Sequence, residues 1–168
     1  MGYSTPSACF IIDIEGGGMC KFQFMPDEIV DSDSANYAEY PIAGRSAPLR
    51  GYIGGPPRTL EFTLKFFANP TADGAPKSPG EIKLDIDFLK SLTRPDYAGG
   101  LKPPHKCLII IGAQVQMIGT CDNVSVSIGH GVPWDLGPGL AHGASVSLRF
   151  AEAKDIPLDV YDVRGGSF

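Results

Sequence analysis

The chain has 168 residues, 43 % of them hydrophobic, and a net charge of −5, which is enough for one domain with a single core. The acidic balance leaves no basic patch that would neutralise phosphates, which argues against specific nucleic-acid binding. No apolar run approaches the ~20 residues of a membrane-spanning helix, and residues 1–6 lack the pattern of a signal peptide. We therefore expect no membrane partner and a protein that stays in the cytosol until it is assembled.

Glycine and proline are frequent and evenly spread. The 21 glycines and 15 prolines stand between apolar runs, which is typical of a β-rich fold with many turns. The four cysteines are isolated in apolar surroundings and form no CxxC pair, so we expect buried, reduced thiols at Cys9, Cys20, Cys107 and Cys121.

The N-terminal third predicts a hairpin followed by an irregular excursion. Ala8–Glu15 and Met19–Met25 read as two strands joined by a turn at Gly16–Gly18. The triple glycine could also suggest a phosphate-binding loop, but no helix follows it. Residues 26–57 predict short strands and a long exposed excursion that ends at a break over residues 54–57.

The middle of the chain predicts one strand and one helix. Arg58–Phe67 alternates apolar and polar residues, as in a strand with one face in the core. Ser78, Pro79 and Glu81 form a helix start with a capping box, so a helix should run from Pro79 to about Leu92. Its apolar arc is wide, which predicts that it packs on a sheet and also meets another surface. The central stripe is Ile82, Ile86 and Leu89, widened by Leu84, Phe88 and Leu92.

The C-terminal half predicts four further strands: Lys106–Ile111, Val115–Ile118, Cys121–Ile128 and Ser145–Ala151. Together these elements indicate a mainly β (α+β) fold, an antiparallel barrel or sandwich with one principal helix. We expect a single domain over residues 1–168, with its core at about 8–152 and a C-terminal extension at 153–168.

The loop Gly129–Gly143 is longer than a hairpin turn and is rich in apolar residues. It contains the single tryptophan. Exposed apolar loops usually contact a partner, and the alternative is that the tryptophan folds back to cover an open end of its own sheet. The candidate intersubunit contacts are Val132, Pro133, Trp134, Leu136 and Leu140.

No constellation of catalytic residues is visible, so we predict no catalytic, metal-binding or cofactor-binding residue and no enzyme. His105, His130 and His142 lie beside proline or glycine in loops. His130 and His142 flank the apolar loop, but the sequence offers them no acidic or thiol partner for zinc. Asp85 and Asp87 stand two apart on the helix and are expected to be solvated charges.

Several segments in chain order resemble one family. Phe22–Ile29 resembles the signature near the start of the contractile injection system tube/baseplate protein family, with Met25 in place of the usual Asn. Ala47–Leu49 followed by Gly55–Phe67 resembles that family's "Pro-x-Leu, then x-Arg-x-Leu-x-x-x-Leu-x-Phe" block. Later matching positions extend the resemblance over roughly Cys9–Glu152.

The resemblance implies a tail-tube or hub fold and a homo-oligomer, a six-fold ring around the tube axis. It implies a structural subunit of a contractile phage tail baseplate that joins the central hub to the tail tube and docks wedge or sheath proteins. Genomic DNA would pass through the lumen without specific binding, and the protein would end in the virion after assembly in the host cytoplasm. Members often carry a C-terminal LysM domain, and the chain stops at Phe168 where that domain would begin, so we expect a LysM-lacking version.

Two alternatives stay open at this stage. One is the tail tube subunit itself. The other is a carbohydrate- or peptide-binding module of the tail that uses the Trp134 loop as an aromatic platform.

Overall fold

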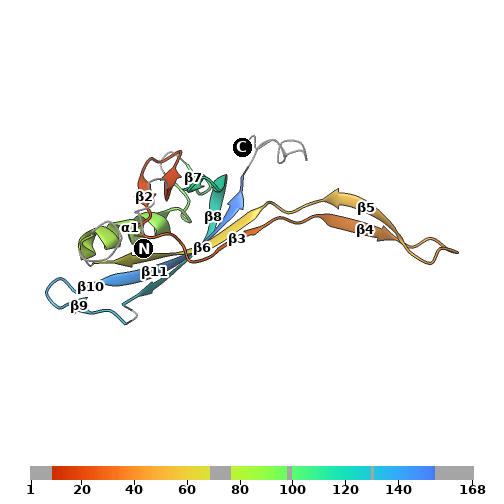
Figure 1. Cartoon of the computed structure of the whole chain (residues 1–168). Coiled ribbons are helices and arrows are strands. Elements are labelled where there is room, and N and C mark those ends of the chain that lie inside the picture. The colour runs from red at the N-terminus through yellow and green to blue at the C-terminus, as the bar shows by residue number, and fades with distance from the viewer. Residues whose placement is uncertain (1–8, 69–76, 98–99, 130, 154–168) are drawn as a thin grey trace.

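A computed structural model describes residues 9–68, 77–97, 100–129 and 131–153, and its centre is one antiparallel sheet of seven strands in the order β2-β1-β7-β8-β11-β6-β3 (Figure 1). This confirms the predicted mainly β, antiparallel fold with one principal helix. The strands of this sheet are β1 (Cys9–Asp13), β2 (Met19–Lys21), β3 (Ile29–Ser32), β6 (Thr59–Phe67), β7 (Lys106–Ile111), β8 (Val115–Ile128) and β11 (Gly143–Glu152).

Two small hairpins complete the described fold. β4 (Asn36–Tyr40) pairs with β5 (Leu49–Gly54), and β9 (Trp134–Asp135) pairs with β10 (Leu140–Ala141). The helix α1 (Pro79–Ser91) is the only α-helix among the described residues, and it is not long or apolar enough to cross a bilayer. The predicted C-terminal extension lies almost entirely outside the described residues.

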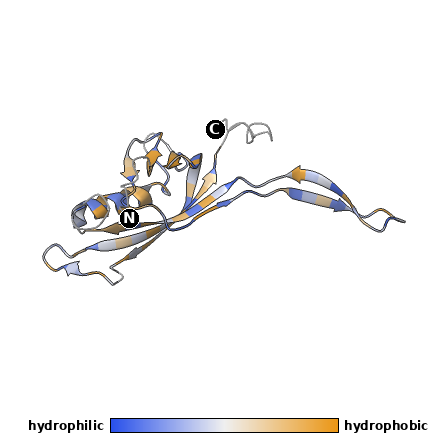
Figure 2. Cartoon of the chain, in the orientation of Figure 1, coloured by the Kyte–Doolittle hydropathy of each residue, from blue (hydrophilic) through white to orange (hydrophobic). Residues whose placement is uncertain are grey.

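The core lies between the sheet and α1 (Figure 2). β6 alternates as its sequence predicts, because every second side chain faces the helix and is buried. The rings of Phe62 and Phe150 stack at 5.9 Å across β6 and β11. The helix buries the predicted stripe and turns Leu84 outward. The central buried residues are Leu60, Phe62, Leu64, Phe66, Ile82, Ile86, Leu89, Val146, Leu148 and Phe150.

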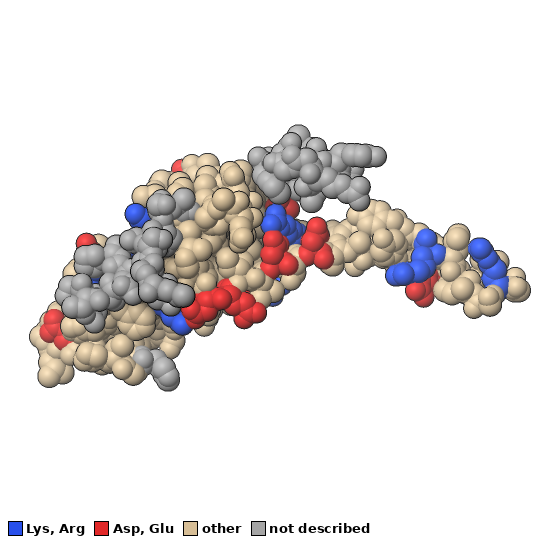
Figure 3. Space-filling model, in the orientation of Figure 1, with Lys and Arg blue, Asp and Glu red and all other residues tan. Residues whose placement is uncertain are grey.

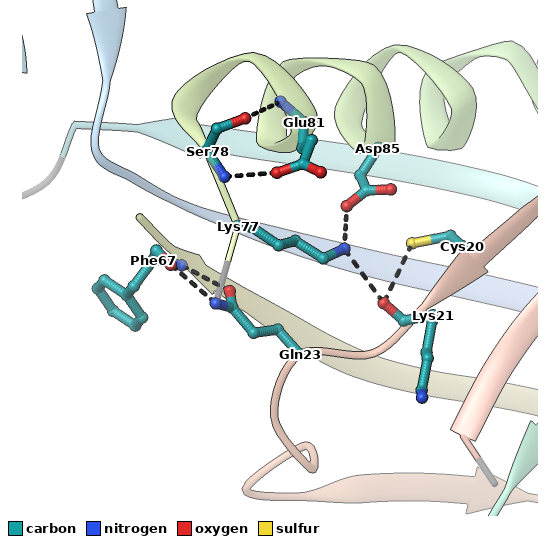
Figure 4. A network of polar contacts seen from close by, with 8 residues as sticks. All are labelled: Cys20, Lys21, Gln23, Phe67, Lys77, Ser78, Glu81 and Asp85. Carbon is teal, nitrogen blue, oxygen red and sulfur yellow. Dashed lines mark hydrogen bonds and ion pairs between the residues drawn. The ribbon is translucent and has the colours of Figure 1, made fainter. Parts of the chain in front are cut away.

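The helix begins where its capping chemistry predicts. The Ser78 hydroxyl accepts a hydrogen bond from the N–H of Glu81 at 3.3 Å, and the Glu81 carboxylate accepts from the N–H of Ser78 at 2.6 Å (Figure 4). Just before the cap, the Lys77 ammonium contacts the carboxylate of Asp85 and donates to the carbonyl of Lys21 at 3.4 Å. Asp85 is therefore not a solvated charge as predicted, because this largely buried ion pair helps to fix α1 to β2. Asp87, by contrast, is exposed and pairs with Lys83.

The strand after the first turn is shorter than predicted and ends at Lys21 instead of Met25. Beyond it, the side-chain amide of Gln23 makes the two hydrogen bonds that the backbone of a neighbouring strand would make. It accepts from the N–H of Phe67 at 2.8 Å and donates to the carbonyl of Phe67 at 2.7 Å. The sheet therefore curls until the segment after β2 meets the end of β6.

Two predicted strands are one. Val115–Ile118 and Cys121–Ile128 form the continuous β8, with a bulge opposite Arg149 and Phe150. Gly119, which falls in the gap between the two predicted strands, lies within β8. The position requires glycine because a Cβ there would stand 2.4 Å from the carbonyl oxygen of Ala151.

All four cysteines are free and buried, as predicted. Burial raises the pKa of the Cys20, Cys107 and Cys121 thiols to about 12, which keeps them protonated at neutral pH.

Candidate functional site

The longest projection of the molecule is an arm made of β4 and β5, which leaves the body where β3 ends and returns to it where β6 begins (Figure 1). None of the residues 31–57 is buried. The rings of Tyr37 and Tyr52 meet edge to face at 5.7 Å, and the Arg50 guanidinium lies 4.8 Å from the centre of the Tyr37 ring. The exposed large apolar residues of the arm are Tyr37, Tyr40, Ile42, Leu49, Tyr52 and Ile53.

The arm has no core of its own. A two-stranded hairpin is marginally stable in water, and here apolar side chains lie on both of its faces. Its charge also differs from that of the whole chain, because Arg45 and Arg50 outnumber Glu39 while the chain carries −5. Figure 3 shows basic side chains over the far part of the arm and acidic ones gathered at its base. These features are those of an assembly surface.

A second feature is a three-stranded ribbon, β8–β11–β6, with partly unpaired edges. β7 pairs only with residues 115–120 of β8, and β3 pairs only with residues 59–62 of β6. Beyond these points β11 is the only strand paired with β8 and β6 among the described residues, and at the end of β6 the Gln23 side chain bonds the backbone of Phe67. The two unpaired edges face opposite ways, one on each side of β11.

The hydrogen-bond pattern shows which backbone groups these edges present. Gly129 donates its N–H to the carbonyl of Gly143, so alternate residues of β8 from there face β11 and the others face away. On β6, Phe67 faces Gln23, so the odd-numbered residues face away from β11. The outward backbone groups along the edges without a described strand partner belong to Val124, Val126 and Ile128 on β8 and to Thr63 and Lys65 on β6.

The ribbon's face away from the helix is polar and nearly neutral. The hydroxyls of Thr63 and Ser147 lie 2.9 Å apart, and Glu61 pairs with Arg149 at 3.4 Å. Lys65 contacts Asp27. A groove of about 540 Å³ crosses this face, lined by Asp27, Glu28, Val30, Glu61, Phe62, Thr63, Lys65, Asn123, Ser147, Leu148 and Arg149.

A third feature is a groove of about 260 Å³ between α1 and the β9–β10 hairpin. Trp134 forms one wall and is 50 % exposed. Its indole covers the backbone of Gly129, where a Cβ would lie 2.6 Å from the ring. Gly129 also has φ +74°, so the position suits glycine on both counts. Ile82 and Ile86 of the helix form the other wall.

Comparison with solved structures places this fold. The SPP1 Dit protein, presented as a paradigm of the hub adsorption apparatus of phages infecting Gram-positive bacteria, matches 88 % of the chain with a TM-score of 0.51 and 16 % identity. The chain shares its fold with half of a phage tail hub protein. It spans 50 % of the length of Dit, and at this identity the likeness is one of fold.

A second match is the tail of an empty GTA particle with C6 symmetry. It covers 90 % of this chain and 95 % of that one at 16 % identity, with a TM-score of 0.39. This likeness is too low to carry an argument. No protein-family model and no curated protein matches the sequence.

The five predicted contact residues do not form one cluster. Trp134 and Leu140 line the groove beside α1. Val132 lines a separate pocket of about 180 Å³ near Phe67, while the carbonyl of Pro133 accepts from the N–H of His142. Leu136 stands at the hairpin tip and is 94 % exposed. Whether any of them touches another subunit remains a prediction.

His105 lies beside an acidic residue of the first hairpin and not in the 129–143 loop. His105 Nδ1 lies 2.9 Å from the carboxylate of Asp13. His130 falls outside the described residues, so its approach to His142 stays untested. Within the described residues no group of three potential metal ligands comes together.

Proposed function

We propose that this protein is a structural, non-enzymatic subunit of a contractile phage tail baseplate, forming a ring that joins the central hub to the tail tube. The observation that carries the proposal is the arm, a long hairpin with apolar residues on both faces and no buried residue. Such a surface has a physical reason to exist only in an assembly, where a neighbour covers it. The shared fold with a phage tail hub protein supplies the kind of assembly.

The unpaired edges of the β8–β11–β6 ribbon supply a mechanism for closing a ring. Because β6 and β8 are both antiparallel to β11, they run in the same direction. Rotation about an axis would place the β8 edge of one copy beside the β6 edge of the next, as a parallel pair in a head-to-tail contact. Six copies, the number that the family resemblance implies, would form one continuous barrel.

In that barrel the polar face of the ribbon would line the lumen. It presents hydroxyl groups and internally paired charges, with no cluster of Lys or Arg to bind phosphates. Genomic DNA would pass through such a channel without specific binding. The arms would then reach over neighbouring subunits, and the outward surface around α1 would remain for wedge or sheath proteins.

The test is electron microscopy of the purified chain and of the particle that contains it. We expect closed six-fold rings from the pure protein and a single ring in the particle, between hub and tube. A protein that stays monomeric at every concentration would contradict the proposal. Rings repeated along the whole tail would instead identify the tail tube subunit, and glycan binding by the monomer would favour a carbohydrate-binding module.

A further inference from the structure

The groove between α1 and the β9–β10 hairpin has the chemistry of a peptide-binding site. Its floor and walls are apolar, and the rim on the helix carries Lys83, Asp87 and Lys90. Asp87 pairs with Lys83 at 3.2 Å, whereas Lys90 has no carboxylate partner among the described residues. The rim is therefore positive by one charge. Exposed apolar side chains continue from it at Ile128 and Trp134.

We propose that this groove binds residues 154–168 of a neighbouring copy of the chain. This segment has apolar residues at 156, 158 and 160, and its three aspartates outnumber its two basic residues, Lys154 and Arg164. In an extended bound form, the side chains of Ile156, Leu158 and Val160 would face one way, into the groove. Asp155 and Asp159 alternate with these residues, so they would lie outside the apolar floor and could meet the basic rim.

The distance that the extended segment can span decides whether the groove binds the chain's own segment or that of a neighbour. The groove lies at the start of β11, beside Gly143, whereas the chain leaves the sheet after Glu152. Ten strand residues at ~3.3 Å each put these two points ~30 Å apart. Ala144, the groove residue nearest to Glu152 along β11, lies ~26 Å from it. An extended chain covers at most ~3.5 Å per residue, so Ile156 and Leu158 reach no farther than ~14 Å and ~21 Å from Glu152, and only Val160, at ~28 Å, could reach the near edge of the groove. The apolar stretch as a whole therefore falls short of its own groove, and a neighbouring copy supplies it.

This inference rests on the proposed function only in requiring that copies lie side by side. It adds a strap that ties each subunit to the next, separate from the strand edges and the arm. It would also make Trp134 and Leu140 intersubunit contacts, because both line the groove.

The single tryptophan of the chain makes the test direct, because its fluorescence reports on the groove. The full chain is compared with the full-length variant Ile156→Ser/Leu158→Ser/Val160→Ser. We expect the emission of the wild-type chain to shift to shorter wavelength as concentration rises, and that of the variant to stay at the wavelength of an exposed indole. A synthetic peptide of residues 154–168, which contains no tryptophan, should restore the shift in the variant with saturable one-to-one binding.

Two controls separate specific binding from adhesion. A peptide with Asp155 and Asp159 replaced by Lys should bind the variant at least about 10-fold more weakly, as should the wild-type peptide to the variant carrying Lys90→Glu as well. Equal binding of both peptides, no saturation, or a wild-type shift that does not depend on concentration would overturn the inference. Ring formation is measured on the same samples by mass. Rings without peptide binding would refute the strap alone, and binding without rings would refute the proposed function alone.

Discussion

Two polar side chains are buried in the described part of the molecule, Asp13 and Gln23, and both fix the first hairpin. The Asp13 carboxylate accepts hydrogen bonds from the N–H groups of Glu15 and Gly16 and meets the imidazole of His105. Burial opposes its ionisation, but these hydrogen bonds outweigh burial and hold the pKa of Asp13 below its ordinary value. The hydrogen bond to Asp13, with the negative charges of Asp13, Glu15 and Asp96, raises the pKa of His105 against the opposing effect of burial.

This pair predicts how stability varies with pH. The contribution of His105 is complete below its unfolded pKa of ~6.5 and is lost as pH rises through its higher folded pKa. The contribution of Asp13 is present above ~3.8 and is lost as pH falls through its lowered folded pKa. Thermal unfolding of the wild type should therefore show Tm falling as pH rises above ~6.5, and His105→Asn should flatten that slope. An unchanged slope in the variant would refute the pairing.

Gln23 predicts a large local effect on stability. Gln23→Ala removes both hydrogen bonds to Phe67 and leaves a partly buried N–H and carbonyl without them, which should cost ~1–3 kcal/mol of unfolding free energy. Urea denaturation followed by circular dichroism measures it. Gln116→Ala, at an exposed position on β8, is the control and should stay within about 0.5 kcal/mol of the wild type. Equal losses in both variants would show that Gln23 does not close the sheet.

At the scale of elements, periodicity and capping were reliable wherever local chemistry decides the structure. The helix start at Ser78 and the alternation of β6 follow directly from neighbouring residues. The division of β8 into two strands was wrong because a glycine in the sequence is equally consistent with a turn and with a strand position that another backbone approaches closely. At Gly119 that backbone group is the carbonyl of Ala151. Only the packing of the distant β11 distinguishes the two. Asp85 was misjudged for the same reason, since its partner Lys77 precedes the helix.

The ribbon edge on β6 can be tested without disturbing its pairing with β11. The N–H of Lys65 faces away from β11, so Lys65→Pro removes a group that only a neighbouring strand would need. The monomer should fold, because Leu64 is already in the extended conformation that proline requires before it. Rings should be lost. Lys65→Ala removes the same exposed ion pair with Asp27 but keeps the N–H, and it should form rings normally. Native mass spectrometry measures the number of subunits in the assemblies of both variants. Intact rings of Lys65→Pro would show that the contact does not involve this edge of β6.

At the scale of the whole molecule, the exposed excursion over residues 26–57 could be predicted, but not its shape. Its polar segments hid the pairing of Tyr37 with Tyr52 and of Tyr40 with Leu49, because the eight residues 41–48 separate even Tyr40 from its partner. The loop 129–143 attracted attention through its tryptophan, yet the arm exposes more large apolar side chains. Apolar residues that a chain cannot bury by itself are the signal that was available in the sequence. Recognising these residues in the sequence would have required knowing which apolar side chains are not buried in the core.

The arm therefore predicts a separation between folding and assembly. Tyr40→Ser/Leu49→Ser/Ile53→Ser removes apolar area that the monomer does not bury, so its unfolding free energy should change by less than ~1 kcal/mol. Association should weaken by at least ~3 kcal/mol, about 100-fold, if these side chains are buried against a neighbour. Tyr97→Ser/Leu101→Ser makes the same kind of change at two even more exposed positions on the body and should leave association within about threefold of the wild type. Sedimentation equilibrium gives both constants. If the arm variant assembled as tightly as this control, the arm would not be an interface, and the proposed ring would lose the observation that carries it.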